Sequence, residues 1–216
     1  MKRIVLLVVL VVGWLATTGQ ERAFSEAYRK GVEAMEREDA EGAMGWFRKA
    51  LEENPQDGYS LFMVAGIRQA AGELDTALSY ADAALRFLPE EDREYRAAAM
   101  TARGRILLEM GRGDEAVGSL TEAIALNPGN VVLYYARGEM LWQLDRYEES
   151  DKDFRRVAEM EPENAAGYLG LGRNAAERGR YREALEWFVK ARRAVPDDMD
   201  AQLAEAECRM ALGDYG

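Results

Sequence analysis

Apolar and polar residues after position 20 follow a pattern that predicts a series of similar helices. Ala, Leu, Glu, Arg and Met dominate this part of the chain, and these residue types favour helices. Proline cannot continue a helix, so it is common one or two residues beyond a helix C-terminus. Each proline of this chain follows the apolar end of a segment, and these prolines are Pro55, Pro89, Pro128, Pro162 and Pro196. The pattern predicts an all-α chain whose helices end at regular intervals.

The intervals reveal an internal repeat. Successive prolines lie 34, 39, 34 and 34 residues apart. Small residues recur at one position of the first helix of each interval, at Gly31, Ala65, Gly104, Gly138 and Gly172. Large apolar residues recur at one position of the second helix, with Ala81 as the exception, at Phe47, Leu120, Phe154 and Phe188. Small residues permit close helix crossings and large ones fill the space between them.

This 34-residue pattern of small, large and proline positions resembles the tetratricopeptide repeat family. The resemblance implies a right-handed superhelical α-solenoid of helix-turn-helix units, in which each unit contacts its neighbours and the stack presents a concave surface. The resemblance implies that residues 20–216 form one repeat domain. The repeats are 24–57, 58–91, 97–130, 131–164 and 165–198, with a partial sixth at 199–216.

Two local features refine the repeat. A glycine that favours the left-handed conformation is expected between the two helices of a repeat, and Asp145 takes its place in the fourth. The five extra residues 92–96 are charged and compatible with a helix. We expect them to lengthen the first helix of the third repeat by more than one turn, to residues 90–110; a longer loop is the alternative.

In the family that the chain resembles, the first helix of each repeat lines the concave groove. Aromatic side chains there are candidate anchors for a protein or peptide partner, because such residues dominate protein interfaces. Packing between repeats is the alternative role for each of them. The candidate groove residues are Tyr28, Tyr59, Phe62, Arg105, Tyr135, Glu139, Trp142, Leu169 and Arg173.

Charges alternate at one position of four successive first helices, at Arg105, Glu139, Arg173 and Glu207. We favour a row of ion pairs along the groove; the alternative is that the two arginines bind acidic groups of a partner. Some family members bind the C-terminal carboxylates of chaperones through Lys, Asn and Arg. The corresponding positions here are Tyr28, Val32, Met63, Ala98 and Ala102, so that activity is not supported.

The N-terminus has a different pattern. A basic start at residues 1–3 precedes an uncharged apolar run from Ile4 to Ala16, and small residues follow before Gln20. These are the three regions of a secretory signal peptide, so residues 1–19 are expected to direct export to the periplasm or beyond. A retained membrane anchor and a buried core helix are the alternatives. The run is shorter than the roughly 20 apolar residues of a spanning helix.

Composition narrows the chemistry. The net charge of −11 disfavours nucleic acid as a partner. The chain has no histidine, which removes the commonest general base and metal ligand. We expect its one cysteine, Cys208, to be a small buried apolar residue. No glycine-rich phosphate loop is present, and we expect no cofactor and no metal site.

These observations predict a non-catalytic scaffold or adaptor of the cell envelope that binds a protein or peptide in its groove. The alternative is an N-terminal sensory or regulatory ectodomain of a longer signalling protein or enzyme. It rests on the ending Gly213–Gly216, where another helix is expected to begin. A hydrolase acting on envelope polymers is a third hypothesis, although no carboxylate pair stands out by its spacing.

Overall fold

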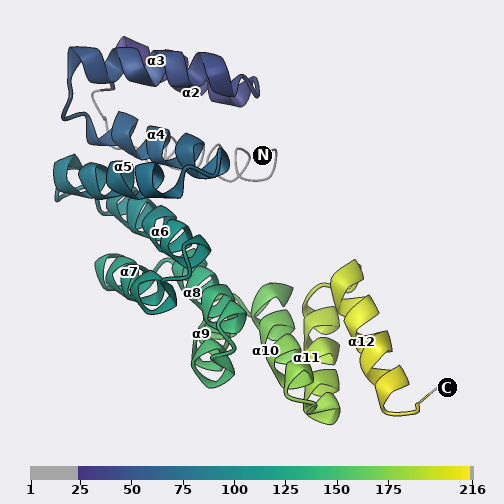
Figure 1. The fold of residues 1–216 in the computed structure, drawn as a ribbon. Helices are drawn as coiled ribbons and strands as arrows, with labels where there is room; N and C mark the ends of the chain where they lie inside the picture. The colour runs from purple at the N-terminus through teal and green to yellow at the C-terminus, as the bar shows by residue number, and fades with distance from the viewer. Residues whose placement is uncertain (1–23, 215–216) are drawn as a thin grey trace. The chain divides into compact units, whose positions relative to one another are not determined.

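The computed structural model describes residues 24–214, which form eleven α-helices and no strands (Figure 1). The predicted signal peptide, residues 1–19, lies outside the described residues, as do Tyr215 and Gly216 of the predicted partial sixth repeat. The helices are α2 (Glu26–Glu36), α3 (Ala40–Glu53), α4 (Gly58–Ala70), α5 (Leu74–Phe87), α6 (Arg93–Glu109), α7 (Gly113–Leu126), α8 (Val131–Gln143), α9 (Tyr147–Met160), α10 (Ala165–Glu177), α11 (Tyr181–Ala194) and α12 (Met199–Ala211).

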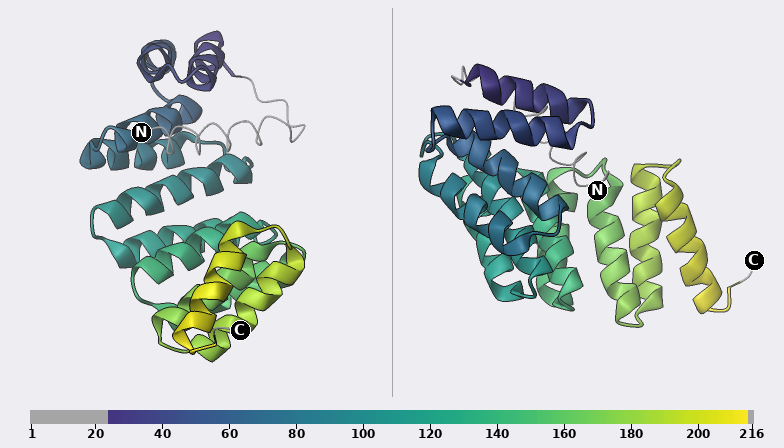
Figure 2. Two further views of the ribbon diagram at one scale, coloured as in Figure 1. Left: turned by 90° about the vertical axis from the view of Figure 1, so that its right-hand side faces the viewer. Right: turned by 45° about the horizontal axis from the view of Figure 1, so that its top comes forward.

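The chain divides into two compact units at the boundary between Asn127 and Pro128. In the first unit consecutive helices pair as the hairpins α2/α3, α4/α5 and α6/α7. In the second unit α8 pairs with α9, α10 pairs with α11, and α12 packs against α11 (Figure 2). The predicted all-helical fold of paired helices is confirmed in both units.

Helix starts follow from capping side chains. Asp92 accepts a hydrogen bond from the backbone N–H of Tyr95 at 3.2 Å, so α6 begins at Arg93 and not at residue 90. The helix has 17 residues, against 13 in α8 and α10, which makes it about 26 Å long. The predicted lengthening by more than one turn is therefore confirmed, and the alternative of a longer loop is wrong.

The turn within each repeat has the expected left-handed residue. Gly179 has φ 69°, and Asp145 adopts φ 57° at the equivalent position. The turn is closed by a hydrogen bond from Arg146 N to Leu141 O at 2.8 Å. The Asp145 carboxylate also accepts a hydrogen bond from the Tyr147 hydroxyl at 2.6 Å, which raises the pKa of Tyr147 to about 12. Asp145 thus replaces glycine and contributes a local bond of its own.

The small and large positions of the repeat meet as predicted. A Cβ placed on Gly172 would overlap the ring of Phe188, which is buried between α10 and α11. A Cβ placed on Gly138 would lie 3.0 Å from Cε1 of Phe154, a tight contact without overlap. Glycine lets the aromatic ring lie directly on the helix backbone, which accounts for the spacing that recurs between these positions along the chain.

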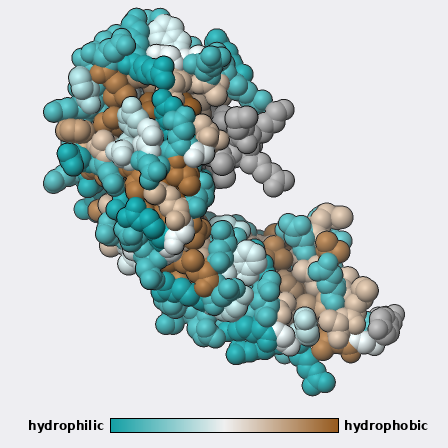
Figure 3. Space-filling model, in the orientation of Figure 1, coloured by the Kyte–Doolittle hydropathy of each residue, from teal (hydrophilic) through white to brown (hydrophobic). Residues whose placement is uncertain are grey.

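The last helix carries apolar residues on its outer face. Met199, Leu203 and Met210 of α12 are 75%, 60% and 63% exposed. The space-filling view shows apolar residues gathered over this helix (Figure 3). Cys208 lies on the opposite side of α12 and is buried, as predicted, and burial raises the pKa of its thiol.

Candidate functional site

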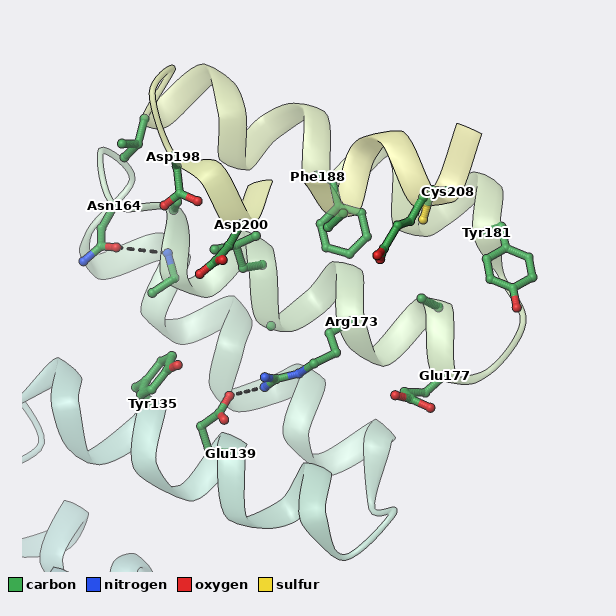
Figure 4. A pocket seen from close by; sticks show the side chains of 18 residues that line it. Tyr135, Glu139, Asn164, Arg173, Glu177, Tyr181, Phe188, Asp198, Asp200 and Cys208 are labelled. Carbon is green, nitrogen blue, oxygen red and sulfur yellow. Dashed lines mark hydrogen bonds and ion pairs between the residues drawn. The ribbon is translucent and has the colours of Figure 1, made fainter. Parts of the chain in front are cut away.

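A pocket of about 580 Å³ opens in the second unit between α8, α10 and α12 (Figure 4). Its apolar lining includes Leu169 of α10, Phe188 of α11 and Ala204 of α12. Tyr135 of α8 and Tyr181 of α11 contribute rings that are 36% and 40% exposed. The pocket therefore combines an apolar floor with two aromatic side chains that a binding partner can reach.

Two polar networks fix the helices around this pocket. Asn174 of α10 is fully buried, and its Nδ2 donates to Ser150 Oγ at 3.0 Å and to Asp151 Oδ1 at 2.8 Å on α9. Glu205 of α12 accepts from Arg192 Nε of α11 at 2.6 Å and also from Arg209. These bonds join α10 to α9 and α12 to α11, so they hold α10 and α12 in position around the pocket.

Helix caps account for two polar residues of the rim. The Asn164 carboxamide oxygen accepts from Ala166 N at 3.0 Å, and Asp198 Oδ1 accepts from Ala201 N at 2.8 Å. Each side chain satisfies a backbone N–H that would otherwise lack a partner at a helix start. The cap also fixes where the second oxygen of Asp198 lies.

The centre of the pocket holds an ion pair between successive repeats. The Arg173 Nη2 group donates to Oε1 of Glu139, and the guanidinium carbon lies 4.2 Å from the ring centroid of Trp142. The centroid of the Phe154 ring lies 5.8 Å from the same guanidinium carbon. A guanidinium is stabilised by the face of an aromatic ring as well as by a carboxylate. Arg173 is thus held by neighbours of its own chain.

The Glu139–Arg173 pair confirms one of the ion pairs that the alternating charges predict. Glu139 and Arg173 are bonded, whereas Arg105 donates from Nη2 to the Gln69 side-chain oxygen at 3.3 Å. Burial lowers the pKa of Arg105, and the charge of Glu109 opposes that effect. Within residues 24–214, Glu207 forms no ion pair and is exposed at the pocket edge. The alternating charges are therefore not a continuous row.

Carboxylates outnumber cations around the pocket. The lining contains Glu139, Glu177, Asp198, Asp200 and Glu207, against Arg173 alone. The pKa of the Tyr135 hydroxyl is raised, first because the ring is partly buried and then because Glu139 is negatively charged. The pocket is therefore an acidic site at neutral pH.

Of the predicted groove residues in the second unit, Tyr135, Glu139, Leu169 and Arg173 line the pocket. Trp142 does not line the pocket; the face of its ring contacts the guanidinium of Arg173. The structure thus brings four of these five side chains together in one site.

The predicted groove residues of the first unit lie in a different environment. Tyr28 and Phe62 are 2% and 4% exposed, so the expectation that a partner can reach them is wrong. Tyr28 stacks on Phe24, and its hydroxyl lies 3.2 Å from that of Tyr95. Tyr59 is half-buried in the same cluster, with its ring centroid 4.8 Å from that of Tyr95. Packing between repeats, the alternative role, accounts for these rings.

Sequence reasoning missed several residues of the pocket. The repeat pattern does not identify Tyr181, Glu177 or Asp200 as pocket residues. Exposed acidic residues have no periodic signal, so their position at a pocket follows only from how α12 packs on α10.

The part of the chain that the structure describes offers no group of three or more acidic or cysteine residues arranged to hold a metal ion. In the same part, no helix is both long enough and apolar enough to cross a membrane.

Comparison with known proteins identifies the class of this fold. The sequence pattern of the tetratricopeptide repeat matches residues 101–150, 135–198 and 169–216. These ranges cover more than half of the chain, so the chain belongs to the tetratricopeptide repeat family. No curated protein sequence matches the chain.

Solved structures share this fold at low sequence identity. YrrB, described as a tetratricopeptide repeat protein with an unusual peptide-binding site, is 21% identical with a TM-score of 0.65, over 83% of this chain and 90% of YrrB. The type IV pilus biogenesis factor PilW is 20% identical with a TM-score of 0.73, over 88% and 86% of the two chains. A tetratricopeptide repeat protein from Parabacteroides merdae is 21% identical with a TM-score of 0.71, over 88% and 73%. At these identities the likeness shows the fold alone.

Proposed function

We propose that this chain is a non-catalytic scaffold that binds a segment of a partner protein in the pocket between α8, α10 and α12. The observation that carries the proposal is the combination of an open apolar floor with the accessible rings of Tyr135 and Tyr181. Clefts of several hundred Å³ with apolar walls and few polar groups are typical binding sites. The tetratricopeptide fold is an interaction scaffold, and the structural neighbour YrrB has a peptide-binding site.

The proposed place of action is the cell envelope. Support comes from the sequence of residues 1–19, which has the basic, apolar and small-residue regions of an export signal. PilW, a pilus biogenesis factor, has the same fold and is compatible with such a location. Fractionation of cells that express the full chain tests this part: recovery of the chain in the cytoplasm at full length would contradict it.

Two adjacent tyrosines of α8 give a matched test of the binding site. Tyr135 lines the pocket, whereas the hydroxyl of Tyr134 donates to Pro128 O at 3.2 Å outside it. For a peptide selected from a random displayed library on the full chain, Tyr135→Ala should weaken binding by at least about 1 kcal/mol. Tyr134→Ala should change the binding free energy by no more than about a few tenths of a kcal/mol relative to the wild type.

Circular dichroism of both variants provides the folding control. Selected peptides that bind wild type and Tyr135→Ala equally well, with helix content unchanged, would refute the proposed site. A hydrolytic activity of the purified chain, abolished by a substitution in the pocket, would replace the scaffold by an enzyme.

A further inference from the structure

The negative charge of the second unit is concentrated in the pocket. Residues 128–216 contain 18 acidic and 13 basic side chains, and the pocket lining accounts for five of the acids and one of the bases. The rest of the unit has 13 acids against 12 bases and is nearly neutral. The acidity of the pocket is therefore a local property and does not simply follow the charge of the whole chain.

The one cation of the pocket is already neutralised. Arg173 is bonded to Glu139 through Nη2 and lies over Trp142, so a carboxylate of its own chain balances its charge. Removing this pair from consideration leaves four carboxylates, at Glu177, Asp198, Asp200 and Glu207. Within residues 24–214, Glu177, Asp200 and Glu207 form no ion pair and are exposed. An acidic partner would meet these charges without a free guanidinium to offset them.

Three of these four carboxylates, Asp198, Asp200 and Glu177, lie toward the two ends of the pocket, with Phe188 and the Glu139–Arg173 pair between them. Figure 4 shows Asp198 and Asp200 beside Asn164 at one end, and Glu177 beside Tyr181 at the other. Phe188 lies between the two ends. A segment that crosses the pocket would therefore pass carboxylates at one end, then the apolar side chains and the neutralised Glu139–Arg173 pair, and then a carboxylate at the other end.

We propose that the pocket selects a basic segment of its partner protein, in which an apolar side chain lies on the floor and lysine or arginine side chains lie at both acidic ends. This inference rests on the proposed function and adds the chemistry of the partner. Complementary charge accelerates association and fixes the register of a bound segment, while like charge disfavours the wrong partner. Because the carboxylates are exposed, salt should weaken the complex, with a Debye length of about 8 Å at physiological ionic strength.

Selection from a phage-displayed library of random peptides tests the partner's chemistry. The library is panned on the full chain, and clones that bind Tyr135→Ala equally well are discarded. The peptides that remain should be enriched in lysine and arginine around an apolar residue, and their affinity should fall as salt is raised. Fluorescence anisotropy of the most enriched peptide then gives its dissociation constant.

Two pairs of substitutions separate the local charge from the net charge. Glu177→Gln with Glu207→Gln removes two carboxylates of the pocket, and should weaken that peptide by about tenfold. Glu163→Gln with Glu186→Gln removes the same net charge from exposed positions that do not line the pocket, and should change the affinity by less than about twofold. Thermal unfolding of both double variants shows whether either change disturbs the fold.

Each result decides between the two proposals. Enrichment of neutral or acidic peptides that depend on Tyr135 would overturn the basic partner and leave the proposed function standing. The absence of any peptide that depends on Tyr135 would overturn both. Equal weakening by the two double variants would also overturn the basic partner, because the pocket carboxylates would then have no special role.

Discussion

Replacing Gly172 with alanine tests how closely the two helices of a repeat pack. A Cβ on Gly172 would overlap Cε1 of Phe188 and lie 2.7 Å from Cδ1 and 2.8 Å from Cζ of the same ring. The ring is 5% exposed and is enclosed by Ala175, Ala184 and Cys208, so it has little room to move. The new methyl group must therefore displace a buried ring or the helix that carries it.

Two opposing effects set the size of the change. Overpacking a core by one carbon costs about 1–3 kcal/mol. Alanine in place of glycine inside a helix contributes about 1 kcal/mol of stability. Their sum predicts that Gly172→Ala lowers the free energy of unfolding by about 0–2 kcal/mol.

A second glycine supplies the reference. Gly45 lies inside α3, and a Cβ placed on it meets no atom within 4 Å. Gly45→Ala should therefore show only the helical contribution and stabilise the chain by about 1 kcal/mol. Urea unfolding followed by circular dichroism gives both values, and the two variants should differ by about 1–3 kcal/mol.

A double variant assigns the cost to the aromatic ring. Phe188→Leu removes the ring atoms that the new methyl group would overlap, so Gly172→Ala should be less damaging in that background by at least about 0.5 kcal/mol. If Gly172→Ala instead stabilises the protein as much as Gly45→Ala does, the close packing described here is refuted.

Three further substitutions test electrostatic and backbone features. Burial favours the neutral form of Glu205, but hydrogen bonds from Arg192 and Arg209 outweigh this effect and lower its pKa. The ionised carboxylate therefore stabilises the fold above the usual carboxyl pKa, and this stabilisation is lost as the pH falls through the lowered pKa. Glu205→Gln should thus cost about 1–2 kcal/mol in urea unfolding at pH 7 and less at pH 3, and an equal cost at both would contradict the assignment. Asp153 is buried and accepts from Arg137 at 2.7 and 2.8 Å, so Asp153→Asn should lower stability by about 1–3 kcal/mol, and an unchanged unfolding midpoint would be inconsistent with this pair. Asp145→Gly should raise the melting temperature slightly, since glycine adopts the left-handed turn without steric strain, and a lower melting temperature would show that the bond from Tyr147 matters more.

The helices could be predicted because their signals are local. Proline follows every hairpin, glycine or Asp145 lies in the turn of every hairpin but the first, and a glycine faces an aromatic ring in three hairpins, as Gly172 faces Phe188. The first residue of each helix could not be predicted from the repeat alone, because it depends on the capping hydrogen bond. In α6 the bond from Tyr95 N to the Asp92 carboxylate places the start at Arg93.

The site could be predicted only in part. Tyr135 and Arg173 were found from their position in the first helices, and the pairing of Arg173 with Glu139 followed from the same register. Tyr28 and Phe62 occupy the equivalent repeat position, yet the five-residue insertion adds Tyr95 beside both of them. The Tyr95 ring centroid lies 6.2 Å from that of Phe62, and its hydroxyl lies 3.2 Å from that of Tyr28. Whether a side chain is accessible depends on this packing, which the repeat register does not contain.

The acidic character of the pocket could not be predicted from the periodic positions. Asp200 is the second residue of α12, and Glu177 is the last of α10. Asp200 lies in a first helical turn, where acidic residues are common, and Glu177 is an exposed residue at a helix end, so neither position by itself indicates a binding site. Their shared location depends on the packing of α12 against α10 and α11.

The most direct test of the account is a crystal structure of the full chain with a peptide selected on it. We expect the peptide to lie between α8, α10 and α12, with an apolar side chain near Leu169 and a basic side chain near Glu177 or Asp200. A peptide bound instead to the first unit, or to the outer faces of α9 and α11, would contradict the central claim that this pocket is the binding site.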